Sequence, residues 1–354
     1  MSELKAVEPV IAESFSELAA KLQELPQAGH KAMIVGDSNT IPLFGEAVQE
    51  AVAPVFSSTA VFAFEAGEEN KTLLSIQALL AYMIDLHYDR KDLIIAVGGG
   101  VVGDMAGFAA AIYLRGIAVV QLPTTLLAQI DSSIGGKTGV DFDGYKNMIG
   151  AFKMPSLVYT NSSALESLPD DQFRAGMGEV VKTALLGDPE LYDWLFDHAD
   201  EVLNRDRDAM LEMIRRTAAV KVAVVKRDPT EQGERALLNL GHTIGHAIEK
   251  AAFFNMIHGD CVSVGLHAAA EMSYARGYIS KEELDRIAEL YRLYGLPSEV
   301  EGFDPTEILK LTKSDKKMQQ GQIRFILIRK PGEAFFTDEM TDEELLAGIR
   351  TVVK

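Results

Sequence analysis

Cysteine and basic residues are both scarce in this chain. Its single cysteine, Cys261, excludes an intrachain disulfide and fits a reducing cytosol. Lysine and arginine number 34 against 52 aspartates and glutamates, which gives a formal net charge of -18. This balance argues against general binding of nucleic acid or of anionic membranes, because both need a basic surface. An anionic substrate would therefore have to be held by basic residues concentrated in one place.

Long apolar runs and repeats are also lacking. The most apolar region, residues 94–122, is interrupted by Asp104, Arg115 and several glycines, so no spanning helix of about 20 apolar residues is expected. The N-terminus has glutamates and no apolar core, which is unlike a signal peptide. We therefore expect a cytoplasmic protein, and the length of 354 residues suggests two domains.

Short apolar runs alternate with helical patterns in the first half of the chain. Strand-like runs lie at 32–39, 60–70, 92–100 and 116–123, and helical spacing is clearest at 72–88. This alternation predicts a parallel sheet with crossover helices.

The second half has mostly helical periodicity. Helices are expected over 171–187, 189–203, 208–227, 236–252, 260–276 and 280–293, with one clear strand at 322–328. We therefore predict an α/β domain at residues 1–168 and a mostly helical domain at residues 169–354. Ligand sites commonly lie between two such domains.

Glycine-rich segments follow two of the expected strands. Gly98–Asp104 stands between a strand and a helical segment, where glycines let the backbone approach a phosphate and a helix N-terminus favours an anion. The alternative is a tight turn with no ligand. Residues 121–139, with Lys137, Lys146 and Asn147, could clamp a phosphate or carboxylate through backbone N–H groups and the two ammonium groups. The alternative for this segment is a long ordered surface loop.

Four of the seven histidines lie between residues 242 and 267. His242 and His246 are four residues apart and share one helical face, and His258 follows beside a glycine. Two imidazoles and one carboxylate form a common catalytic zinc set, and Glu179 in an apolar helical stretch is the best carboxylate candidate. A lone histidine is more often structural, but three clustered with glycines favour a metal. His267 is interpreted as packing.

Several basic residues stand in apolar surroundings: Arg115, Lys182, Lys221, Arg235 and the pair Lys316–Lys317. Such residues are usually part of a solvated helix face. That explanation is less natural for Lys221 and Arg235, which are flanked by apolar runs. Cys261 is interpreted as a small buried hydrophobe.

In combination, five segments resemble the 3-dehydroquinate synthase family in order and spacing, from about residue 65 to 330. They are GGGVVGDMAGFAAAIYLRG, QLPTTLLAQIDSSIGGKTGV, KNMIGAF, NLGHTIGHAIE and IHGD. The resemblance implies an N-terminal Rossmann-like NAD-binding α/β domain, a mostly α-helical C-terminal metal-binding domain, and a homodimer. It also implies a fold shared with glycerol dehydrogenases and iron-dependent alcohol dehydrogenases.

The resemblance assigns roles residue by residue. The metal ligands fall on Glu179, His242 and His258. The NAD contacts fall on Gly67, Glu68, Glu69, Asn70, Lys71, Gly100, Val101, Val102, Gly103, Asp104, Thr124, Thr125, Lys137 and Lys146, with Asp37 and Asn39 on the adenosine side. The catalytic and substrate positions fall on Asp131, Lys137, Asn147, Lys182, Lys221, Arg235, Asn239, His246 and Lys316 (favoured over Lys317), with Arg115 expected to reach a neighbouring subunit's site.

The activity implied is conversion of 3-deoxy-D-arabino-heptulosonate 7-phosphate to 3-dehydroquinate and phosphate, a step of the shikimate pathway. NAD would oxidise the substrate transiently, before phosphate elimination, reduction, ring opening and aldol closure. One divalent metal, zinc first and cobalt as an alternative, suits the ligand set. A sister sugar phosphate cyclase and an NAD-dependent polyol dehydrogenase of the same fold are the alternatives. The chain departs from the family's usual pattern at Gly178 and at Asp260, and an altered hydrogen bond to a ligand histidine is the expected consequence of the second departure.

Overall fold

The structure is a computed structural model, and it describes residues 5–253, 255–314 and 324–354. The chain forms two compact units: Met1–Leu168 with Met210–Thr230, and Pro169–Ala209 with Glu231–Lys354. Helix α8 (Arg207–Arg227) therefore belongs mostly to the first unit, although its sequence lies in the predicted second domain. The physical reason is packing, because Ala218 and Val222 form a buried apolar cluster with Ile134.

The first unit is built on a six-stranded parallel sheet, ordered β1-β8-β5-β4-β2-β3. The strands are β1 (Val10–Ala12), β2 (Lys31–Asp37), β3 (Ser58–Phe64), β4 (Leu93–Gly98), β5 (Ala118–Pro123) and β8 (Leu157–Asn161). Helices α1 (Leu18–Gln23), α2 (Thr40–Val52), α3 (Leu73–Asp85) and α4 (Gly100–Ile112) connect them. The predicted parallel α/β architecture is confirmed.

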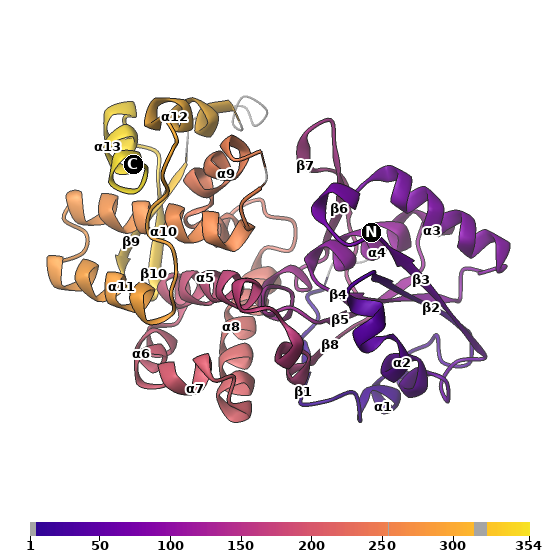
Figure 1. The fold of residues 1–354 in the computed structure, drawn as a ribbon. Helices are drawn as coiled ribbons and strands as arrows, with labels where there is room; N and C mark the ends of the chain where they lie inside the picture. Colours follow the sequence, from indigo (N-terminus) through magenta and orange to yellow (C-terminus); the bar gives the residue numbers. More distant parts are fainter. Residues whose placement is uncertain (1–4, 254, 315–323) are drawn as a thin grey trace. The chain divides into compact units, whose positions relative to one another are not determined.

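Successive side chains of the central strands enter two different cores, as the pleat of a strand requires. Met33 and Val35 of β2 pack in the core that contains residues of α3 and α4, whereas Ala32 and Ile34 pack in the core that contains residues of α1 and α2. Figure 1 shows these helix pairs on opposite faces of the sheet. Both faces of the sheet are thus covered, which explains the nearly continuous apolar runs of the strands.

The segment after β5 is ordered. It forms a π-helical turn, Ala128–Ser132, and then an antiparallel hairpin of β6 (Lys137–Phe142) and β7 (Tyr145–Phe152). Gly139 and Gly150 face each other in this hairpin, and a Cβ at Gly139 would lie 2.8 Å from the Ile149 carbonyl oxygen. Neither the hairpin nor its register follows from the sequence analysis, which left this segment as a binding loop or a surface loop.

The second unit is mostly helical, as predicted. It contains α5 (Asp170–Gly187), α6 (Pro189–Asp197), α7 (Ala199–Leu203), α9 (His242–Ala251), α10 (His258–Ala275), α11 (Lys281–Leu293), α12 (Pro305–Ser314) and α13 (Asp342–Val352). A hairpin of β9 (Phe325–Lys330) and β10 (Glu333–Thr337) completes it.

Two expected helices are interrupted in the structure. The helix expected over 189–203 breaks at His198 into α6 and α7. The helix expected over 236–252 is a 3-10 turn (Glu234–Asn239) followed by α9, because Gly241 has φ 80. Helices α12 and α13 were not predicted; a capping box of Thr341 and Glu344 starts α13. None of the described helices is both long and apolar enough to cross a bilayer.

His267 lies inside the second unit, where it packs against the ring of Tyr291 at 5.5 Å between centroids. Its Nδ1 is buried and accepts or donates no hydrogen bond within the described residues, and Nε2 lies 3.8 Å from Glu271 Oε1. Burial lowers the pKa of His267, Lys354 lowers it further, and Glu271 and Glu299 partly oppose this. The folded protein therefore takes up this proton at lower pH than the unfolded chain does.

The consequence is a loss of stability in mild acid. The contribution of His267 is fully present above the unfolded pKa of about 6.5 and decreases as the pH falls through the folded value, by at most about 1.4 kcal/mol per pH unit. His267→Phe keeps a ring against Tyr291 and removes the titration. We expect urea unfolding between pH 5.5 and 7.5 to show a shallower pH dependence for the variant than for the wild type. Identical slopes would contradict this account.

Candidate functional site

Glycines let three helices of the second unit approach one another closely. Gly241 precedes α9, and a Cβ there would lie 2.7 Å from the Leu266 nitrogen of α10. Gly245 of α9 is similarly close to Cys261, with a Cβ 2.9 Å from its carbonyl oxygen. A Cβ at Gly178 of α5 would lie 2.9 Å from the carbonyl oxygen of Gly259. These contacts bring α5 and α9, which carry candidate ligands, onto α10.

Two predicted metal ligands, His242 and His258, lie at this junction together with His246, and the third, Glu179, lies beside His242. Glu179 Oε1 of α5 lies 3.6 Å from His242 Nε2 of α9. His242, His246 and His258 each offer a ring nitrogen within 4.8 Å of the others. His242 Nδ1 lies 3.2 Å from the Leu240 carbonyl oxygen, which can only accept, so Nδ1 carries the proton and Nε2 presents its lone pair towards Glu179.

The charge state of this group suits a metal ion. Burial, followed by the positive charge of Lys182, lowers the pKa of His242 well below its ordinary value, so the imidazole is neutral near pH 7. Glu179 is 1 % exposed and forms an ion pair with Lys182. Among the described residues, none gives either Glu179 carboxylate oxygen a hydrogen bond. A buried carboxylate with no hydrogen bond from the described residues, beside the neutral imidazole of His242, fits a divalent cation.

Two further carboxylates lie close to the candidate ligands, and the sequence predicted the contacts of neither. Glu249 of α9 is buried, and its Oε2 lies 3.4 Å from His258 Nδ1, where it can orient the ring. Asp260, at which the chain departs from the family pattern, accepts from Arg174 Nε at 3.3 Å and from Nη2 at 2.9 Å. The carboxylate of Asp260 thus joins α10 to α5, and the predicted effect of this position on a hydrogen bond to a ligand histidine stays a prediction. The sequence signal that could have identified Glu249 is an acidic residue on the same helix as His242 and His246.

The other candidate residues of this unit lie on α5, α9 and the turn before α9. Lys182 is buried against Glu179, and His246 is exposed. Arg235 is 2 % exposed, among the largest buried side chains. Asn239 Nδ2 donates to Glu231 Oε1 at 3.0 Å, a partner that the sequence analysis missed. Lys316 and Lys317 lie outside the described residues.

In the first unit, the glycine-rich segment turns from β4 into the N-terminus of α4. The first turn of a helix leaves its N–H groups without intrahelical partners, and here they belong to Gly100, Val101 and Val102. A Cβ at Gly100 would lie 3.1 Å from Ser132 Oγ, and one at Gly103 would lie 2.8 Å from Gln121 Oε1. The glycines thus serve close packing, and the helix N-terminus suits a pyrophosphate.

The residues after β2 and β3 adopt tight turns. Asp37 Oδ1 accepts from the backbone of Asn39 at 3.0 Å and from the backbone of Thr40 at 2.8 Å, so Asp37 stabilises the turn that leads into α2. Gly67 has φ 120, and the 3-10 turn Glu68–Asn70 follows it. A side chain at Gly67 would be strained by this backbone conformation.

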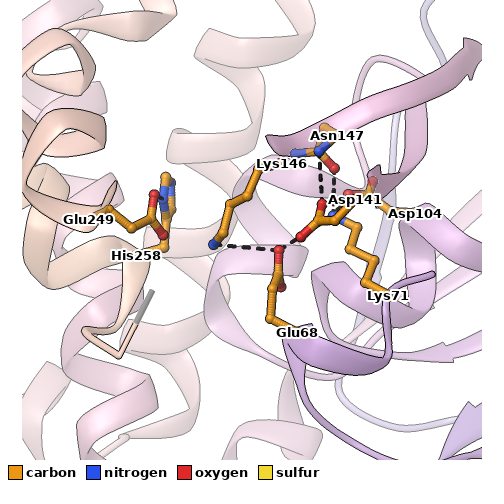
Figure 2. A network of polar contacts seen from close by, with 8 residues as sticks. All are labelled: Glu68, Lys71, Asp104, Asp141, Lys146, Asn147, Glu249 and His258. Carbon is orange, nitrogen blue, oxygen red and sulfur yellow. Dashed lines mark hydrogen bonds and ion pairs between the residues drawn. The ribbon is translucent and has the colours of Figure 1, made fainter. Parts of the chain in front are cut away.

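Lys71, which is itself buried, forms the centre of a polar network. Its Nζ donates to Asp104 Oδ2 at 2.7 Å and to Asn147 Oδ1 at 2.6 Å. Figure 2 shows Lys71 between these two residues, with Glu68 and Lys146 beside them. Burial raises the pKa of Asp104, and the positive charge of Lys71 opposes that shift. The ammonium of Lys71, a predicted cofactor contact, thus links two other candidate residues, and its role towards the cofactor stays a prediction.

The remaining predicted residues of this unit form two groups. Thr124 is buried at the end of β5, and Thr125 Oγ1 accepts from the Ala128 backbone at 3.2 Å. Lys221 Nζ of α8 lies 2.7 Å from Asp131 Oδ1, whereas Lys137 at the start of β6 is exposed. Arg115 is exposed and has φ 69, directly after Leu114 with φ 49. Each unit therefore carries one set of candidate residues, and the roles expected for them stay predictions.

The comparisons with known proteins assign a family. The 3-dehydroquinate synthase N-terminal model matches residues 61–175, and the 3-dehydroquinate synthase C-terminal model matches residues 176–318. A 3-dehydroquinate synthase from Acidithiobacillus ferrooxidans is 44% identical over 308 residues, which are 87% of this chain and 85% of that protein.

Solved structures of two related enzymes share the fold. The 2-epi-5-epi-valiolone synthase of Streptomyces hygroscopicus, with NAD+ and Zn2+ bound, matches with a TM-score of 0.89 and 28% identity, covering 99% of this chain and 98% of that one. A 2-deoxy-scyllo-inosose synthase complexed with carbaglucose-6-phosphate, NAD+ and Co2+ matches with a TM-score of 0.85 and 26% identity, covering 98% and 99%. Both family models match consecutive parts of the chain, and a curated relative is 44% identical to it. This chain therefore belongs to the 3-dehydroquinate synthase family of carbon–oxygen lyases.

Proposed function

We propose that this chain converts 3-deoxy-D-arabino-heptulosonate 7-phosphate to 3-dehydroquinate and phosphate. The observation that carries the proposal is the buried Glu179 carboxylate beside the neutral His242 in a chain that both family models match. Glu179, His242 and His258 would hold one divalent metal, zinc or cobalt. The N-terminus of α4, with the residues around Lys71, Thr124 and Lys146, would hold NAD. Bound NAD supplies a reversible hydride acceptor, and a bound metal supplies a Lewis acid towards a substrate hydroxyl.

The chain's own residues supply orientation and charge. Leu240 and Glu249 fix the ring orientations of His242 and His258, respectively. Lys221 and Arg235 provide the positive charge that a phosphate or carboxylate needs in a chain of net charge -18. His246 is exposed and close to the two ligand histidines, so it can transfer a proton between solvent and substrate.

We propose further that Arg115 acts from one subunit of a homodimer towards the other, in a cytoplasmic enzyme. In support, the turn at Leu114 and Arg115 has a left-handed backbone, and Ile112, Leu114 and Arg115 are exposed, which suits residues covered by a second copy. The boundary between the two functional domains is proposed to lie near residue 168 of the sequence. Sedimentation velocity of the wild-type chain tests the assembly.

A sister cyclase activity is the second candidate, because the valiolone and inosose synthases share the fold over nearly the whole chain. The higher identity to a 3-dehydroquinate synthase, 44% against 28% and 26%, favours the first candidate. A polyol dehydrogenase is disfavoured because a simple polyol needs no cluster of basic residues.

The test is a phosphate-release assay with the heptulosonate phosphate, catalytic NAD and zinc. We expect phosphate to be released without accumulation of NADH, because the hydride returns to the same molecule. Product identification by mass spectrometry and NMR separates 3-dehydroquinate from the products of sister cyclases. NADH that accumulates in proportion to substrate consumed would instead assign the chain to the dehydrogenases.

A further inference from the structure

The β6–β7 hairpin contains an irregularity at the two candidate residues Lys146 and Asn147. Val140 pairs with Ile149, and the next pair is Phe142 with Tyr145. Between these pairs, β6 has the single residue Asp141, whereas β7 has residues 146–148. Bulges of this kind redirect side chains and occur next to active sites.

Asp141 holds this bulge from the opposite strand. Its backbone N–H donates to the Lys71 carbonyl oxygen at 2.9 Å, which fixes Asp141 to the turn before α3. Its Oδ1 accepts from the Asn147 backbone N–H at 2.8 Å. Asn147 has φ 51, a left-handed conformation that asparagine adopts more readily than other residues with a Cβ but that still benefits from a hydrogen bond that fixes it. The carboxylate of Asp141 accepts that hydrogen bond.

The side chains of the bulge are held by a second set of contacts. Asn147 Oδ1 accepts from Lys71 Nζ at 2.6 Å, so its backbone is held by Asp141 and its side chain by Lys71. Lys146 Nζ lies 3.4 Å from Glu68 Oε1. Figure 2 shows Asp141 between the Asn147 backbone and the Lys71 side chain. Without the Asp141 acceptor, the backbone of Asn147 would be free to leave the left-handed region, and both side chains would move.

The network around Asp141 is also sensitive to charge. Burial raises the pKa of Asp141, the hydrogen bond from Asn147 lowers it, and Glu68 raises it. Burial lowers the pKa of Lys71, but the negative charges of Asp104 and Glu68 raise it by more. The pKa of Lys71 is therefore above its ordinary value. Asparagine at position 141 would keep an acceptor for the Asn147 N–H and lose only the charge, which separates the two contributions.

We propose that Asp141 is a positioning residue, which fixes the bulge at residues 146–148 and thereby places the Lys146 ammonium and the Asn147 amide for cofactor and substrate. In this proposal Asp141 acts through the bulge and does not itself bind cofactor or substrate. The proposal rests on the proposed function for the roles of Lys146 and Asn147, but the contact between Asp141 and the bulge does not depend on it.

The experiment compares Asp141→Ala, Asp141→Asn and the control Asp143→Asn, which changes an exposed residue at the tip of the same hairpin. Amide hydrogen exchange over 141–150 reports the bulge, NAD titration calorimetry reports binding, and steady-state assays give kcat and KM. For Asp141→Ala we expect exchange at Asn147 to be faster by about tenfold or more, weaker NAD binding, and kcat/KM lower by about a hundredfold. Asp141→Asn should stay within about threefold of the wild type because it keeps the acceptor.

Two results would overturn the proposal. Unchanged exchange in Asp141→Ala would show that the carboxylate does not hold the bulge. Faster exchange with wild-type kcat, KM and NAD affinity would reduce Asp141 to a structural residue of the hairpin. If the wild type releases no phosphate from the heptulosonate phosphate, the proposed function fails, whereas exchange and NAD affinity still decide the role of Asp141.

Discussion

Glu179→Gln is expected to lower turnover by roughly 10³-fold or more. The amount of metal bound to the protein is expected to fall together with the turnover. Glutamine has nearly the same shape but offers no negative charge to a divalent cation. The metal would then be held by neutral imidazoles alone, and each lost anionic ligand weakens binding of a hard or borderline cation. Metal analysis of the purified variant and a phosphate-release assay measure the two effects together.

The environment of Glu179 makes a second variant necessary. Lys182 forms a buried ion pair with Glu179, and both side chains are 2% exposed. Removing the carboxylate takes away the negative charge that faces this buried ammonium, which costs several kcal/mol unless Lys182 deprotonates. His242→Gln keeps the Glu179–Lys182 pair and removes one imidazole ligand, so it should lose metal with a smaller effect on folding.

A matched control is available on the same helix as His242. Glu249→Gln keeps the hydrogen-bonding shape beside His258 Nδ1 and should weaken metal affinity by only about 10–100-fold. Near-UV circular dichroism and thermal unfolding of each variant show whether the fold persists. A folded Glu179→Gln protein that retains metal and full activity would remove Glu179 from the ligand set and leave the three histidines as the candidate site.

Residues whose partners are close in sequence were the ones that the sequence could predict. His242 and His246 share one helix face at a spacing of four residues, and the strand before Gly98–Asp104 is uniformly buried. Residues whose partners come from another element were not predictable. Asp260 and Arg174 are 86 residues apart in sequence, and their ion pair joins α10 to α5. No pattern in either helix predicts this pair.

The hairpin of β6 and β7 shows a different reason for failure. The burial of β7 does not follow a clear alternation, and glycines at 139, 144 and 150 resemble those of a loop. In the structure, Gly139 and Gly150 are facing residues of a ladder in which a Cβ would collide with the partner backbone. Their role depends on the register of the two strands, which is a tertiary property. The sequence pattern of α8 predicts a helix correctly. It does not predict the unit to which the helix belongs, because that depends on the apolar surface against which the helix packs.

Lys221→Met is expected to lower both stability and turnover, and the double variant with Asp131→Asn is expected to recover stability alone. Lys221 Nζ lies 2.7 Å from Asp131 Oδ1, and the two side chains are 10% and 26% exposed. Because the pair is partly buried, removing one partner leaves a poorly solvated charge and should cost about 1–3 kcal/mol. Removing both charges abolishes that penalty, so the free energy of unfolding should return close to the wild-type value.

Turnover is expected to behave differently from stability in this cycle. If Lys221 holds an anionic group of the substrate, Lys221→Met should lower kcat/KM by about a hundredfold or more, and Asp131→Asn in the same chain cannot replace the lost charge. Urea unfolding and phosphate-release kinetics on the wild type, the two single variants and the double variant complete the cycle. Lys226→Met serves as the control, because this lysine of the same helix forms an exposed pair with Glu8 and should change stability by less than about 1 kcal/mol.

The two possible outcomes have different consequences for the first unit. A double variant that is stable but inactive would mean that Lys221 and Asp131 are retained for the substrate. The ion pair would then serve to compensate two functional charges that are partly buried in the folded protein. Recovery of kcat/KM together with stability would make the pair a structural connection between α8 and the π-helical turn at Ala128–Ser132. In that case the positive charge for the anionic substrate would have to come from the other basic candidates, Lys137 and Arg235 first.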